Sequence, residues 1–139
     1  MAPGITFASL VLLSTSLVGC EAEYRDVSEV PPHKELIGQV CSMTITFTAF
    51  GVTRKVERDR KTDYVLVSEL RLSGPEFTFA EPIPADAKLR ILSARRCSNC
   101  PFEEYIQYNA ALQPSSPRLT GLPVYVRQSS VSSNALHCG

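Results

Sequence analysis

The chain has 139 residues, of which 14 are lysine or arginine and 14 are aspartate or glutamate, so its formal net charge at pH 7 is zero. This balance disfavours binding to nucleic acid and electrostatic adsorption to anionic lipid, because both need an excess of basic side chains. Without residues 1–19 the chain has the length of one domain, whose core is large enough to fold alone, and a second domain does not fit.

The chain begins with an apolar segment, ITFASLVLL over residues 5–13, and no charged residue precedes Glu21. Nine residues rise only about 14 Å as a helix, roughly half of the hydrocarbon thickness of a bilayer, so a resident transmembrane helix is not expected. A secretory signal peptide over residues 1–19 fits better, although no lysine or arginine precedes the apolar run. We therefore expect the protein to be exported.

The end of this segment, Leu17-Val18-Gly19-Cys20, resembles the lipobox of bacterial lipoproteins. The resemblance implies that cleavage makes Cys20 the N-terminus and that Cys20 carries fatty acids such as palmitate. Two or three acyl chains, at about 0.8 kcal/mol per buried methylene, hold a small domain on a membrane. An aspartate after the lipidated cysteine resembles an inner-membrane retention signal. Glu21 stands there instead, so the periplasmic face of the outer membrane is the expected location. The alternative is an ordinary cysteine beside an ordinary signal peptide.

Residues 20–37 are expected to form a tether between the lipid and the domain. Charged side chains are frequent in this segment, and the Pro31-Pro32 pair favours an extended backbone. A single β-rich domain is then expected over residues 38–139.

Residues 40–50, VCSMTITFTAF, alternate between apolar and polar side chains, which is the pattern of a half-buried strand. Further strands are predicted over residues 64–70, 77–79, 88–94, 105–108 and 124–127. The core residues expected from the alternation are Met43, Ile45, Phe47, Leu89 and Ile91. Six short strands indicate a mainly β fold, a small antiparallel β-barrel or sandwich. Residues 102–112 also satisfy helical spacing, so a helix stays open there.

Four cysteines follow Cys20, namely Cys41, Cys97, Cys100 and Cys138. An even number in an exported protein predicts two disulfides, and four cysteines allow three pairings. Ser98 and Asn99, followed by a proline, form a turn-like sequence that can bring Cys97 and Cys100 together. Our hypothesis is therefore a Cys97–Cys100 bridge, which leaves Cys41 for Cys138.

The same CxxC spacing is also found in thiol oxidoreductases, where a lowered thiolate pKa makes the first sulfur reactive. The segment Gly121-Leu122-Pro123-Val124 resembles the proline loop that faces the active disulfide of thioredoxin-like proteins. However, too few residues separate Cys100 from Pro123 for the helix, strand and second helix of that fold, and no βαβ pattern precedes the CxxC. We therefore favour a structural disulfide.

Other chemistry has weaker signals. The set Cys97, Cys100, His137 and Cys138 has zinc-ligand residue types, but His137 and Cys138 are adjacent and an oxidising compartment favours disulfides. Glu103 and Glu104 could in principle form a glycosidase-like carboxylate pair, but exposed acidic residues are common. The sequence contains no nucleophile motif. We expect neither a metal nor a cofactor, and no enzymatic activity.

The phrases GPEFTF, IPADAKLRIL, CSNCPF and GLPVYV resemble small exported bacterial lipoproteins with a compact β-domain behind the lipid cysteine. This resemblance implies no catalytic residue. The predicted function is a membrane-anchored, disulfide-containing envelope lipoprotein that acts as a non-catalytic protein-interaction module, with an immunity or inhibitor protein as the more specific version. The expected partner is another envelope protein, and the expected contact residues are Tyr64, Tyr105, Tyr108 and Tyr125. The alternative is a thiol-disulfide redox or envelope-maintenance enzyme using Cys97 and Cys100.

Overall fold

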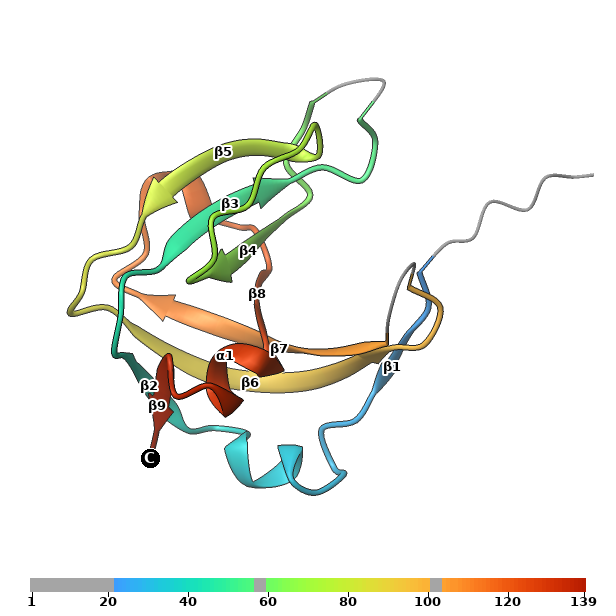
Figure 1. The fold of residues 1–139 in the computed structure, drawn as a ribbon, viewed down its shortest axis with the longest axis vertical. Helices are drawn as coiled ribbons and strands as arrows, with labels where there is room; N and C mark the ends of the chain where they lie inside the picture. Colours follow the sequence, from blue (N-terminus) through green and yellow to red (C-terminus); the bar gives the residue numbers. More distant parts are fainter. Residues whose placement is uncertain (1–21, 57–59, 101–103) are drawn as a thin grey trace, which may run out of the picture.

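The computed structural model describes residues 22–56, 60–100 and 104–139 (Figure 1). The strands are β1 (Tyr24–Asp26), β2 (Val40–Met43), β3 (Thr48–Val52), β4 (Tyr64–Ser68), β5 (Phe77–Pro82), β6 (Lys88–Cys97), β7 (Tyr105–Gln113), β8 (Val124–Arg127) and β9 (Leu136–Cys138). Two 3-10 turns, η1 (His33–Leu36) and η2 (Pro117–Leu119), and the short helix α1 (Gln128–Ser132) lie between them. The strands form one mixed sheet in the order β5-β3-β4-β8-β7-β6-β2-β9, and β1 pairs with β6 next to β2 along the same edge.

The sheet is strongly curved, so that β5, β3 and β4 face β7 and β6 across the core (Figure 1). Neighbouring strands are antiparallel except for β4 and β8, which are parallel. The two ends of the sheet, β5 and β9, do not pair with each other, so the sheet is not closed into a barrel. The structure therefore confirms the mainly β, sandwich-like fold and excludes the closed-barrel alternative.

The central hairpin of β6 and β7 determines which residues face the core. Leu89 and Ile91 are fully buried, as the alternation predicts. A β-bulge between Ile91 and Ser93 then inserts an extra residue, leaves Leu92 exposed and makes Ala94 the next buried position. Beyond the bulge, the odd-numbered residues of β6 consequently point away from the core. Residues 105–112 lie in β7, the strand that pairs with β6. The helical alternative for residues 102–112 is therefore wrong for the described part of that range.

The expected strand over residues 40–50 is interrupted. The chain leaves β2, turns and begins β3, and the turn is held by the Thr44 amide, which donates to the Ala135 carbonyl at 3.0 Å. Ile45 lies in this turn rather than in either strand, so its side chain is not directed into the core. Phe47 is fully buried and Met43 packs against the core, whereas Ile45 is 54% exposed. The prediction of Ile45 as a core residue is therefore wrong.

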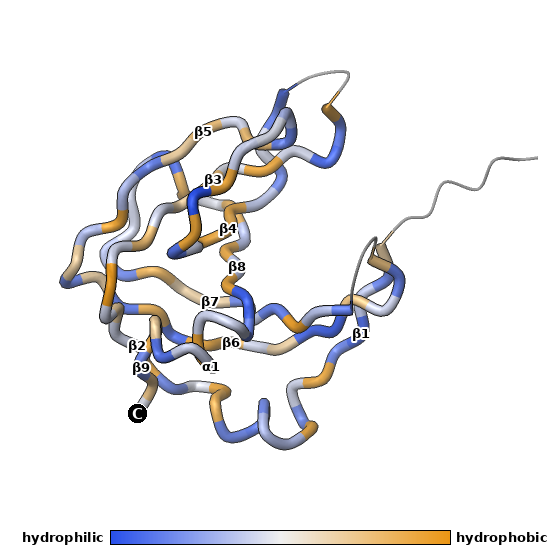
Figure 2. The backbone as a smooth tube through the Cα atoms, viewed as in Figure 1, coloured by the Kyte–Doolittle hydropathy of each residue, from blue (hydrophilic) through white to orange (hydrophobic). Residues whose placement is uncertain are grey.

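From Tyr24 onward the predicted tether is wrong, because residues 24–37 pack on the domain. Strand β1 pairs with the end of β6, Val27 is buried in the core, and His33 is only 3% exposed. The His33 ring nitrogen Nδ1 lies 2.9 Å from the hydroxyl of Tyr108. Figure 2 shows why composition misleads here: the segment from β1 through η1 is mostly hydrophilic, with isolated hydrophobic residues. The packed domain therefore includes residues 24–37, which precede the predicted start at residue 38.

The predicted signal peptide, Cys20 and Glu103 lie outside the described residues. In the part of the chain that the structure describes, we find no helix of the length and apolarity needed to cross a membrane.

Candidate functional site

The face of the sheet opposite the core carries a group of tyrosine and arginine side chains near the end of the β6–β7 hairpin. Strand register places them in two adjacent rows, because directly paired residues and residues two apart in a strand share a face. The first row is Tyr24, Cys97 and Tyr105, and the second is Asp26, Arg95, Gln107 and Arg127. Tyr125 on β8 lies one step further along, and Tyr64 at the start of β4 contacts it. The bulge in β6 brings Arg95 to this face.

Arg95 is the centre of the group. Its guanidinium carbon lies 3.7 Å from the ring centroid of Tyr24 and also 3.7 Å from that of Tyr125. Its Nη2 and Nε donate hydrogen bonds of 2.8 and 3.2 Å to Oε1 of Gln107, a side chain that is 2% exposed. Each cation–π contact contributes about 0.5 to 1 kcal/mol at an exposed site and more when water is excluded. Arg95 therefore links β1, β6, β7 and β8 through one side chain.

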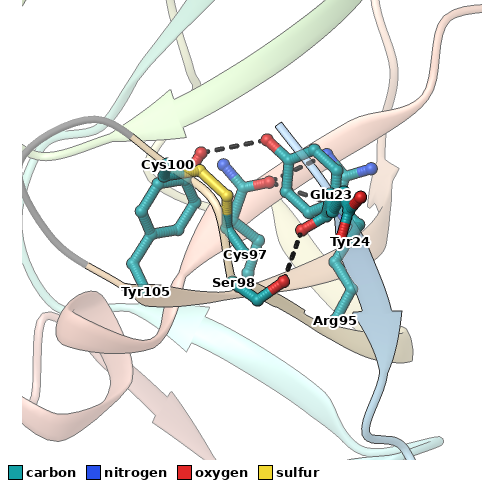
Figure 3. Close-up of a disulfide and its surroundings, with 8 residues drawn as sticks. Glu23, Tyr24, Arg95, Cys97, Ser98, Cys100 and Tyr105 are labelled. Carbon is teal, nitrogen blue, oxygen red and sulfur yellow. Dashed lines mark hydrogen bonds between the residues drawn. A yellow bond between two sulfur atoms is a disulfide. The ribbon is translucent and has the colours of Figure 1, made fainter. Parts of the chain in front are cut away.

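The contacts continue outward from Arg95. The hydroxyl of Tyr24 is hydrogen-bonded to that of Tyr105 at 3.0 Å (Figure 3). The ring of Tyr125 meets that of Tyr64 edge to face, with centroids 5.7 Å apart. Two further guanidinium groups flank the rings, Arg127 over Tyr105 at 4.5 Å and Arg54 over Tyr64 at 5.5 Å. We call this set the tyrosine–arginine array: Tyr24, Tyr64, Tyr105, Tyr125, Arg54, Arg95 and Arg127.

The array is positively charged at neutral pH. Burial raises the pKa of the Tyr105 hydroxyl, and its hydrogen bond with Tyr24 raises it further. Burial also raises the pKa of Tyr64, although neighbouring arginines oppose the shift. These hydroxyls therefore stay neutral, and the charge of the array is that of its arginines. None of the three guanidinium groups forms an ion pair with a carboxylate of the described residues, where the ion pair found is Lys34 with Glu29.

The cysteines pair as predicted, Cys41 with Cys138 and Cys97 with Cys100. Cys97 is fully buried at the end of β6, beside the array (Figure 3). The amide of Ser98, the next residue, donates to the carbonyl of Glu23 at 3.0 Å. The bridge therefore lies directly after the end of β6 to which β1 and Tyr24 are attached.

The proline loop does not face this disulfide. Pro123 precedes Val124, which pairs with Ala110, whereas Cys97 pairs with Tyr105 at the other end of β7. Five residues along a strand correspond to about 17 Å. The thioredoxin-like arrangement is therefore wrong.

The four candidate zinc ligands do not converge either. Cys138 pairs with Cys41 at the level of Leu89, eight residues before Cys97 on β6, a separation of about 25 Å. Each of the three cysteines is also held in a disulfide. Within residues 22–56, 60–100 and 104–139, no three histidine, cysteine or acidic side chains cluster in a way that suits a metal.

Of the tyrosines predicted to form a contact surface, the structure brings Tyr64, Tyr105 and Tyr125 together and separates Tyr108. Tyr108 is 1% exposed and faces the core, so its prediction as a surface contact is wrong. Strand parity contains this information, because residues three apart on a strand point to opposite faces. The sequence reasoning missed Tyr24, which it placed in the tether, and also Arg95 and Gln107.

Comparison with known proteins finds no relative of this chain. The chain matches no protein-family model, no curated protein and no solved structure.

Replacing Arg95 by methionine is expected to lower the free energy of unfolding by about 2 kcal/mol, because two cation–π contacts are lost and the buried Gln107 oxygen loses its donors. The chain has no tryptophan and five tyrosines, four of them in the array, so near-ultraviolet circular dichroism reports on it directly. The tyrosine signal should weaken in this variant. Arg90→Met, on the same strand but exposed, is the matched control. Equal effects in the two variants would show that the array does not order these tyrosines.

Proposed function

We propose that this protein is a membrane-anchored envelope lipoprotein that acts as a non-catalytic protein-interaction module, and that the tyrosine–arginine array is its binding surface. The observation that carries the proposal is the position of Arg95 between Tyr24 and Tyr125. Tyrosine and arginine are among the residue types most enriched at the centres of protein interfaces. Here they are gathered on the sheet face that the core does not use.

The array is also ordered before any partner arrives. Ordering a flexible side chain on binding costs about 0.5 to 1.5 kcal/mol. The ring contacts around Arg95 and the hydrogen bond between Tyr24 and Tyr105 already impose this order in the free protein. Tyr24 remains 37% exposed and can contact a partner directly. More of the free energy of contact is therefore available as affinity.

The envelope location is supported by two features of the chain. Leu17-Val18-Gly19-Cys20 resembles a lipobox, and both disulfides belong to a class of bond that persists in exported compartments. A small disulfide-linked domain with a preordered binding face suits an immunity or inhibitor protein, which neutralises an exported toxin or a wall-degrading enzyme.

The anchor is tested in cells with the full chain. Cys20→Ala is expected to abolish fatty-acid labelling and to leave either unprocessed precursor or soluble protein. Retention of the mutant in washed membranes at the level of the unmodified protein would disprove lipid anchoring through Cys20.

The binding surface is tested in the same cells by photo-crosslinking. A photoreactive residue at position 109, the strand partner of Tyr125, is expected to give a discrete crosslinked band, and one at the exposed position 90 is not. Tyr125→Ala should remove the band. Identical bands from both positions would argue against the array as the surface.

Replacing both Cys97 and Cys100 by alanine tests the redox alternative. A redox enzyme would lose its envelope phenotype in this variant although the domain remains folded.

A further inference from the structure

A second feature lies outside the array, on the part of the molecule formed by β5, the segment before β4, and η2. An open groove of about 580 Å³ lies between these segments. Its polar lining consists of Arg60, Lys61, Arg118, Thr62, Thr78 and Thr120. Three segments distant in sequence therefore contribute cations or hydroxyl groups to one place.

Both arginines of the groove are held in position by the fold. Nη2 of Arg60 donates to the carbonyl of Phe77 at 3.2 Å and to that of Pro75 at 3.4 Å. The guanidinium carbon of Arg118 lies 5.1 Å from the ring centroid of Phe79. An arginine held through one part of its guanidinium group retains other N–H donors for a ligand.

The floor of the groove depends on a glycine in β3. Gly51 pairs with Phe79, and the space that a side chain at Gly51 would need is filled by the Phe79 ring and the Thr78 hydroxyl. Thr78 is in turn hydrogen-bonded to Thr62 at 2.6 Å. The glycine thus lets Phe79 lie across β3, where it supports Arg118 beside the threonine hydroxyls.

The charges of the groove are unbalanced. Its lining, as far as the structure describes it, contains three cations and no carboxylate. Like charges around one space repel each other, and an anion placed between them is attracted by all three. Arginine matches phosphate oxygens in bidentate geometry, and lysine and hydroxyl groups add single donors.

We propose that this groove binds a phosphate-bearing ligand, held by Arg60, Lys61 and Arg118 with the threonine hydroxyls as additional donors. The site is independent of the tyrosine–arginine array and shares no residue with it. The phosphate could belong to a free phosphorylated molecule or to a lipid headgroup, and the experiment below separates these sources.

The test uses the full chain carrying Cys20→Ala, purified with both disulfides formed, so that a lipid anchor does not dominate the result. Titration with pyrophosphate, followed by calorimetry and NMR, is expected to show binding that weakens as salt is added. Arg118→Gln and Lys61→Gln should each weaken it by about tenfold or more, the loss expected for one charge-assisted hydrogen bond. Arg90→Gln removes the same charge from an exposed position outside the groove and should leave binding unchanged.

A flotation assay identifies the source of the phosphate. Binding to phosphatidylglycerol vesicles but not to phosphatidylcholine vesicles, with competition by pyrophosphate, supports a lipid headgroup. Pyrophosphate binding without flotation supports a free phosphorylated ligand. No binding in either assay, or equal weakening by Arg90→Gln and Arg118→Gln, would overturn the proposal. All variants are first compared with the parent by near-ultraviolet circular dichroism, since these side chains are exposed and the fold should persist.

Discussion

Replacing Cys41 and Cys138 together by alanine is expected to lower the free energy of unfolding by about 4 to 5 kcal/mol. The bridge joins residues 97 apart in sequence, so it strongly restricts the unfolded chain. Removing Cys97 and Cys100 together is expected to cost only about 2 kcal/mol, because that bridge spans a separation of 3 residues.

Urea denaturation of the two double variants measures this difference, and non-reducing peptide mapping of the parent confirms the pairing first. The comparison is well matched, because each variant loses two cysteines and each bridge has a fully buried member, Cys41 or Cys97. A larger loss from the Cys97 and Cys100 variant would mean that local order at the end of β6 matters more than restricting the unfolded chain.

Replacing Tyr108 by alanine is expected to destabilise the domain by about 3 to 5 kcal/mol, because a large side chain leaves a cavity in the core. Tyr108→Phe keeps the ring but leaves the buried His33 nitrogen without its hydroxyl partner, at a cost of about 1 to 3 kcal/mol. Chemical denaturation of both variants separates packing from hydrogen bonding. Equal losses would show that the hydroxyl carries the effect.

The same pair predicts how stability depends on pH. Burial lowers the pKa of His33, nearby Arg96 lowers it further, and Glu35 opposes the shift. The folded state therefore favours neutral His33, whereas the unfolded chain binds a proton near its ordinary pKa of about 6.5. This contribution to stability is fully present above pH 6.5 and is lost as the pH falls through the lower pKa of the folded state. His33→Gln should flatten this part of the curve, and an unchanged curve would assign the acid sensitivity to other groups.

The fold class could be read from the sequence because it depends on local alternation. Residues 64–68, 88–91 and 124–127 alternate or carry strand-forming side chains, and all lie in strands. The N-terminal segment could not be read in this way. Its packing needs only a few inward residues, Val27 and His33 among them, and a long-range pairing of β1 with β6 that no local pattern encodes.

The candidate site was predictable only in part, for the same reason. Residue type alone was enough to propose Tyr64, Tyr105 and Tyr125 as contact residues, and the structure places these three side chains in one group. Arg95 could not be identified, because its place on the outer face follows from the bulge between Ile91 and Ser93. Its contact with Tyr24 follows from strand pairing across some 70 residues. Tyr108 was assigned to the wrong face although strand parity separates it from Tyr105.

The early start of β1 limits how the protein can present itself. Only three residues separate Cys20 from Tyr24, and four extended residues span at most about 14 Å. A lipid on Cys20 therefore keeps Tyr24, and with it the adjoining edge of the array, within that distance of the headgroups. If Cys20 is lipidated as proposed, a partner of the array would have to reach it close to the membrane surface.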